Sequence, residues 1–193
     1  MTIEEIIRRD NGILEIKKAI IEGFTKDKIY TFIRLNNLEK TGHGIYVLPE
    51  SWVDECYMLH LRCPHAVFSH DEALYYHGLI DREPVQHTVT VYTGYNTNRL
   101  SADGIKVYTV RRDLVEVGKK IVRNDFQNQI PMYDLERTVV DLIRNRNNFE
   151  IQDFQTALRN YTVRYDKDLN LLMSYAKLFR VDNVLRRYME VLI

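Results

Sequence analysis

The hydrophobic pattern of the first fifty residues predicts three short helices. Isoleucines recur at spacings of three and four over residues 2–10 and 13–22, which is the period of an amphipathic helix. A third helix begins after Thr25, a residue type that caps helix N-termini. Its inward stripe is predicted to be Ile29, Phe32 and Ile33.

The pattern then changes to that of two short strands, residues 38–40 and 45–48. They bracket residues 41–44, a glycine-containing turn, and Pro49 ends the pairing because proline has no N–H to donate. Three helices followed by a hairpin predict a winged helix-turn-helix domain over residues 1–50, in which the third helix enters a DNA major groove.

The rest of the chain mixes strands and helices. A connecting helix is expected over Trp52–Leu61, within residues 51–63, and a C-terminal domain over residues 64–193. Period-two alternation predicts strands, and apolar stripes predict a tail of helices. A capping box is expected at Ser69–Glu72. The expected strands are 65–68, 86–92, 105–111, 115–122 and 129–132, and the expected helices follow Asp134 or span 151–161, 168–179 and 182–191.

The predicted fold class is therefore α+β, with a winged helix-turn-helix domain, a mixed α/β domain and a helical tail. A hydrophobic content of 45% and a charged content of 28% are typical of globular proteins. No apolar run approaches the length of a membrane span, and the first residues do not resemble a signal peptide. We expect a cytoplasmic protein whose two cysteines remain thiols.

The formal net charge of zero gives no support for nucleic-acid binding, so the local charges carry that argument. In the third helix and the hairpin, lysine and arginine outnumber Asp27 and Glu39, which predicts modest affinity that salt weakens readily. Cationic and hydrogen-bonding side chains here can contact phosphates or base edges. The expected DNA-binding residues are Lys17, Lys18, Lys26, Lys28, Tyr30, Thr31, Arg34, Lys40 and His43.

Two other groups of residues suggest chemistry, and both have ordinary structural explanations. A cysteine and histidine cluster between Cys56 and His77 lacks the paired C-x-x-C knuckles of a zinc site. Asp134, Glu136 and Asp141 resemble carboxylates that hold magnesium, but helix capping and an Arg137–Asp141 pair account for them. We expect no catalytic residue, no metal site and no cofactor.

Three ordered motifs resemble the AbiEi family of abortive-infection antitoxins. The first is Gly12 to Pro49, which ends in G-x-G-I-Y-V-L-P; the second is S-x-x-x-A-L-x-x-H-G-L from Ser69 to Leu79. The third is D-L-E-R-T-V-V-D from Asp134 to Asp141, and the C-terminal twenty residues are also similar to that family's last helices.

The resemblance implies a type IV antitoxin that represses its own operon. Its winged helix would bind double-stranded DNA at inverted repeats in the promoter. The protein would be a monomer or a weak dimer, and two copies would pair on the DNA. Its C-terminal domain would neutralise a nucleotidyltransferase-like toxin, with or without direct contact. For that effector surface the sequence offers the basic positions Arg111, Arg112, Arg144 and Arg146.

Two alternatives remain open at this point. One is a winged-helix repressor whose second domain senses a small molecule. The other is a metal-dependent phosphoryl-transfer enzyme built on Asp134, Glu136 and Asp141.

Overall fold

The computed structural model describes residues 2–49 and 51–192 and divides into two compact units. The first unit comprises Met1–Pro64 and the returning segment Asn124–Asn128; the second comprises His65–Arg123 and Gln129–Ile193. The described residues form a mixed α+β structure, as the sequence predicts. The expected boundary at residue 50 lies outside the described residues.

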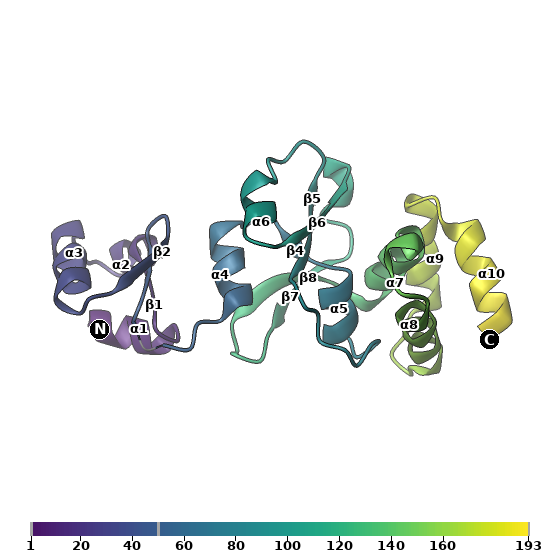
Figure 1. The fold of residues 1–193 in the computed structure, drawn as a ribbon, viewed down its shortest axis with the longest axis horizontal. Helices are drawn as coiled ribbons and strands as arrows, with labels where there is room; N and C mark the ends of the chain where they lie inside the picture. Colours follow the sequence, from purple (N-terminus) through teal and green to yellow (C-terminus); the bar gives the residue numbers. More distant parts are fainter. Residues whose placement is uncertain (1, 50, 193) are drawn as a thin grey trace. The chain divides into compact units, whose positions relative to one another are not determined.

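The first unit holds four helices and a three-stranded antiparallel sheet of order β1-β3-β2 among its described residues (Figure 1). Thr2 opens its first helix with a capping box completed by Glu5, and Thr25 caps the third through the backbone N–H of Lys28. The elements are α1 (Ile3–Arg9), β1 (Ile13–Glu15), α2 (Ile16–Ile21), α3 (Lys26–Leu35), β2 (Glu39–Gly42), β3 (Ile45–Val47) and α4 (Glu55–Arg62).

The predicted helix over residues 13–22 is wrong in its first three positions. Residues 13–15 form β1, which pairs with β3 so that Ile13 faces Val47. Asn11 and Gly12 both have positive φ, and this turn lays the chain alongside β3 before a helix can start. Three residues are too few to show a period, so an apolar I-L-E run reads equally well as helix.

The connecting helix also begins later than expected. Asp54 caps α4 by accepting a hydrogen bond from the N–H of Tyr57, so Trp52 precedes the helix and is 87% exposed. The Asp54 carboxylate accepts further bonds from the side-chain amides of Asn124 and Asn128, at 2.7 Å for Asn128. The returning segment is thereby fastened to the first unit.

The second unit is built on a five-stranded mixed sheet of order β6-β5-β4-β8-β7. Central β4 pairs antiparallel with β5 and parallel with β8, while β5–β6 is parallel and β7–β8 is a hairpin. The short helix α6 (Asn98–Ala102) lies in the crossover between β5 and β6. The strands are β4 (Val67–Phe68), β5 (Thr88–Tyr92), β6 (Lys106–Val110), β7 (Lys119–Arg123) and β8 (Gln129–Tyr133).

Helices follow the sheet in the order predicted. In Figure 1, α7, α8 and α9 lie side by side in green to yellow, and α10 packs on α9 and α7. Their apolar faces share one core with the sheet, which includes Val139, Leu158 and Leu172. The helical elements are α5 (Asp71–Tyr76), η1 (Arg112–Leu114), α7 (Leu135–Arg144), η2 (Arg146–Asn148), α8 (Ile151–Val163), α9 (Leu169–Leu178) and α10 (Asp182–Leu192). No helix in the described ranges combines the length and the apolar character that crossing a membrane requires.

The capping box expected at Ser69–Glu72 is absent. The residue before α5 is His70, in a left-handed conformation with φ +52°, and its side chain does not cap the helix. Thr88 of β5 does so instead, because its hydroxyl accepts from the N–H of Glu72 and donates to the carbonyl of Ser69. A residue on a neighbouring strand therefore takes the role that a local motif suggested.

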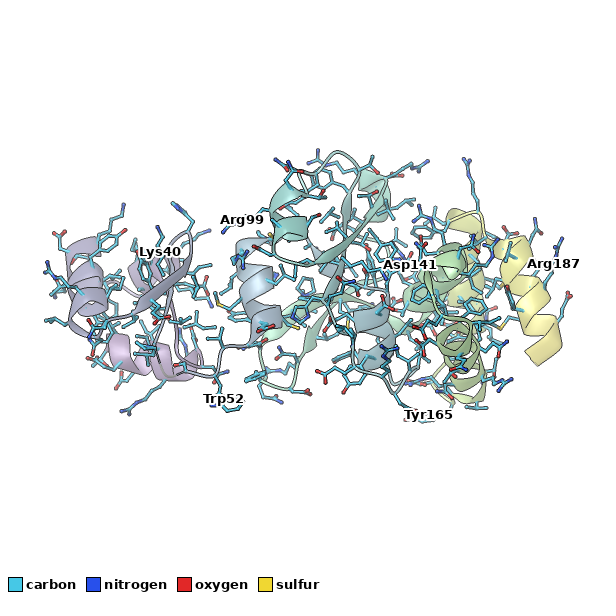
Figure 2. All side chains as sticks on the ribbon, in the orientation of Figure 1. Lys40, Trp52, Arg99, Asp141, Tyr165 and Arg187 are labelled. Atoms are coloured by element: carbon cyan, nitrogen blue, oxygen red, sulfur yellow. The ribbon has the colours of Figure 1, made fainter. Side chains whose placement is uncertain are left out.

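One buried ion pair on α7 contacts the segment around η1. Arg137 and Asp141 are one helical turn apart on α7, fully buried, with Nε and Oδ2 separated by 3.0 Å. The guanidinium also donates to the carbonyls of Leu114 and Val117, at 2.9 and 2.6 Å. Asp141 points into the packed interior in Figure 2.

We predict that Gly118→Ala destabilises the second unit strongly. Gly118 has φ +75°, and an added Cβ would lie 2.5 Å from the Cβ of Arg137. Backbone strain of about 1 to 2 kcal/mol would combine with overpacking of about 1 to 3 kcal/mol. Urea unfolding followed by circular dichroism measures the sum.

Gly94→Ala is the matched control, since Gly94 has φ +95° with open space around its Cβ position. Its free energy of unfolding should fall only by the contribution of backbone strain. Equal losses in the two variants would contradict the close packing of Gly118 on Arg137.

Candidate nucleic-acid interface

The helix α3 has one anchored face and one exposed face. Ile29 is fully buried and Ile33 is 8% exposed, and both pack in the core of the first unit. Phe32, the third residue of the predicted stripe, is partly buried against the same core. The helix is therefore held by its apolar side, and its outer side is left to solvent.

The exposed face of α3 carries the cationic and hydrogen-bonding side chains that the sequence singled out. None of its three cations forms an ion pair within residues 2–49 and 51–192. Tyr30 is 50% exposed, although its ring is large and apolar. The exposed residues are Lys26, Lys28, Tyr30, Thr31 and Arg34.

The hairpin adds two further exposed groups. Lys40 lies on β2 (Figure 2). His43 lies in the turn before β3. A β-bulge between Lys40 and Gly42 shifts the register of the two strands. Apart from Asp27 and Glu39, which are exposed on the same elements, no acidic residue of α3 or the hairpin opposes these cations.

The two lysines of α2 differ in their availability. Lys17 is exposed and makes no ion pair with any described residue. Lys18 pairs with Glu15, lies 3.7 Å from Asp10, and donates to the hydroxyl of Tyr57 at 2.7 Å. Lys18 is thus already neutralised by protein groups, whereas Lys17 is available to an external anion.

The four arginines expected on an effector surface fall into two places. Arg111 forms a bidentate pair with Asp113, and the Arg112 guanidinium lies 4.9 Å from the centre of the Tyr92 ring. Arg144 lies at the end of α7, 5.8 Å from the Phe179 ring. Arg146 in η2 donates to the carbonyl of Ile143 at 3.3 Å.

Sequence reasoning did not identify the environment of His70. Its ring stacks on Tyr108 at 3.4 Å between centroids and is 2% exposed. The side-chain amide of Asn145 donates to Nε2, so the proton sits on Nδ1 and faces the hydroxyl of Ser69. Burial, followed by the charge of Arg137, holds the pKa of His70 well below its ordinary value. No sequence signal could reveal this, because a histidine with positive φ has no motif.

His77 of the cysteine and histidine cluster is also occupied by the protein. Its Nε2 lies 2.8 Å from the carbonyl of Tyr133, and burial lowers its pKa. Both ring nitrogens of His70 and one of His77 thus have protein partners.

The three carboxylates of the proposed magnesium site each have a separate partner. Asp134 caps α7 and accepts from the hydroxyl of Tyr175, while Glu136 accepts from the N–H of Asp168 at 2.8 Å. Asp141 pairs with Arg137, and burial raises its pKa. Within the part of the chain that the structure describes, their oxygens do not come within 4.8 Å of one another as a set.

Comparison with known proteins gives a fold and no activity. No protein-family model matches the chain, and no curated protein matches it in sequence. The chain is similar to the crystal structure of the RV2827C protein from Mycobacterium tuberculosis, with a TM-score of 0.62 at 12% identity. The similarity covers 91% of this chain and 69% of that one, so it supports the α+β arrangement over nearly the whole length.

We predict that the free energy of unfolding decreases at acid pH because His70 takes up a proton on unfolding. Its pKa in the folded protein lies below the value of 6.5 that applies to the unfolded chain, so the unfolded state binds the extra proton. The contribution of neutral, buried His70 to the free energy of unfolding is complete above pH 6.5 and is lost as the pH falls below that value. His70→Asn should reduce the slope of unfolding free energy against pH by up to about 1.4 kcal/mol per unit between pH 6.5 and 5. Identical slopes in the two proteins would show that His70 does not titrate on unfolding.

We predict that Asp134→Ala acts on stability alone. Loss of the cap should lower the unfolding free energy by about 1 to 2 kcal/mol. Addition of Mg²⁺ should leave the melting temperature of both proteins unchanged, and Glu83→Ala, at an exposed loop position, provides a neutral control. A magnesium-dependent rise in the melting temperature, abolished by the substitution, would restore the metal hypothesis.

Proposed function

We propose that residues 2–49 form a winged helix-turn-helix domain that binds double-stranded DNA. The observation that carries the proposal is the two-sided character of α3, with Ile29 and Ile33 fixed in the core and an outer face of unpaired cations. The order of three helices and a hairpin matches the arrangement in which such a helix enters the major groove.

Each exposed side chain then has a separate role. Arg34, Thr31 and Tyr30 contact base edges, because they lie along the outer face of α3. Phosphates are held by Lys26 and Lys28, and by Lys17 from α2. Lys40 and His43 on the hairpin contact the flanking backbone or minor groove.

The arrangement predicts symmetric sites in DNA. A single α3 covers only one short half-site, so two copies of the chain pair on an inverted repeat, with half-sites about one helical turn apart. Such a repeat in the protein's own promoter makes it an autorepressor.

We further propose that the second unit is a non-catalytic antitoxin module. Support comes from the AbiEi-like motifs, two of which lie in this unit at Ser69–Leu79 and Asp134–Asp141. The functional partner is a nucleotidyltransferase-like toxin. Arg112, Arg144 and Arg146 are the positions of the expected effector surface that make no ion pair with any described residue.

We predict that the purified protein binds a labelled fragment of its upstream region in gel-shift titrations. An Arg34→Ala, Lys28→Ala double variant should lose specific binding, because it removes one base contact and one phosphate contact. Affinity of the wild type should fall linearly with salt on a double-logarithmic plot, and the variant should show a shallower slope.

An Arg99→Ala, Lys120→Ala variant is the matched control, since it removes the same charge from exposed positions of the second unit. It should bind as the wild type does. Failure of the folded wild type to bind any upstream fragment at low salt would leave residues 2–49 as a protein-contact module.

Co-expression with the neighbouring gene's product tests the antitoxin half separately. We predict that the α3 double variant loses repression of a promoter reporter but still protects cells from the toxin. Loss of both properties together, in a variant that folds normally, would mean that protection depends on DNA binding.

A further inference from the structure

A hollow of about 650 Å³ lies in the second unit between η2, α8 and α10. Its size is within the range that small-molecule sites occupy. Its lining includes Arg146, Asn147 and Phe149, residues of α8, and Arg187 and Tyr188 of α10. Of the positions assigned a role above, Arg146 of the expected effector surface also lines this hollow.

The charge of the hollow departs from the neutral balance of the chain. Arg146, Arg159 and Arg187 line it, and no aspartate or glutamate among the described residues does. Arg159 and Arg187 are exposed and make no ion pair with any residue that the structure describes. Figure 2 labels Arg187 on α10. An uncompensated group of three arginines favours an anionic ligand, and the guanidinium fork fits phosphate oxygens in particular.

The remaining wall is aromatic. Phe149, Phe154 and Tyr188 line the hollow, and the last two meet edge to face with centroids 5.1 Å apart. The Phe149 ring also lies nearly parallel to the His70 ring, with 6.3 Å between the ring centroids. Aromatic rings beside arginines form the surface on which heterocyclic bases stack.

Two amide side chains also line the hollow, together with Ile151 and Leu158. Asn147 and Gln155 are exposed at the hollow and can donate and accept hydrogen bonds at the edge of a heterocycle. An acidic helix from another protein would use the arginines, but it would have no comparable use for a pair of amides beside an aromatic wall.

We propose that this hollow binds a nucleoside phosphate. The base lies against Phe149 and Tyr188, the amides read its edge, and the phosphates are held by Arg159 and Arg187. The same chemistry is offered by a free nucleotide and by the 5′-phosphorylated end of a single strand. The proposal concerns the second unit and does not depend on DNA binding by α3.

The test is calorimetric titration of the full-length protein with ATP, GTP, CTP and UTP. We expect binding of at least one nucleotide, weakened about tenfold or more in an Arg159→Gln, Arg187→Gln variant, because two charge-assisted contacts are lost. The Arg99→Ala, Lys120→Ala variant should bind as the wild type does. If the double variant does not fold, Arg187→Gln alone replaces it in the titration. The single variant should show a smaller loss of nucleotide affinity.

Three further titrations separate the parts of the ligand. Tripolyphosphate alone and the free nucleoside should each bind at least about tenfold more weakly than the nucleotide, because each lacks half of the contacts. A 5′-phosphorylated tetranucleotide, tested in the Arg34→Ala, Lys28→Ala background so that α3 does not contribute, distinguishes a strand end from a free nucleotide. Tighter binding of either one identifies the source.

No binding of any of these probes would overturn the proposal, as would nucleotide affinity that is unchanged in the arginine variants. Tripolyphosphate binding as tight as the best nucleotide would overturn the role of the aromatic wall. Loss of promoter binding with nucleotide binding retained would instead count only against the proposed repressor function.

Discussion

The buried ion pair of Arg137 and Asp141 is the constraint on which the second unit depends. Burying a guanidinium away from water is costly unless its charge is paired and its N–H groups are hydrogen-bonded, and here only Nη2 has no partner among the described residues. Asp141 supplies the charge, and the carbonyls of Leu114 and Val117 accept two further bonds. The Tyr133 and Phe179 rings lie 3.9 and 4.1 Å from its central carbon. One side chain of α7 thus contacts β8, the segment around η1 and the residue that ends α9.

The sequence predicted the parts of this arrangement that depend on residues close together in the chain. The spacing of Arg137 and Asp141 indicated a pair, and the period of α7 indicated its apolar face. Burial of the pair was not predictable, because it depends on carbonyls about twenty residues earlier and on the Phe179 ring of a later helix. The same distinction explains α5, where Thr88 from another strand replaces a local cap. Strands and helices with several periods were predictable, whereas the three-residue β1 was not.

In the candidate sites too, features that depend on neighbouring residues were predictable, and features that join distant segments were not. The outward cations of α3 could be listed from the sequence, since burial of Ile29 and Ile33 fixes which side faces water. Lys18 differs from Lys17 partly through a local partner, since Glu15 lies three residues earlier, and partly through Tyr57, which lies in a helix much later in the chain and was not predictable. The arginine-lined hollow joins residues from η2, α8 and α10, and no single stretch of sequence carries its pattern.

The returning segment Asn124–Asn128 changes how the chain can be divided. Because Asn124 and Asn128 complete the hydrogen bonds of the buried Asp54 carboxylate, the first unit is not continuous in sequence. The chain passes between the units three times, so a gene fragment that ends at residue 64 encodes an incomplete module. Recombination that exchanged one half for a homologous half would have to exchange this turn as well. A chimaera that keeps each unit whole therefore needs two junctions more than a simple head-to-tail fusion.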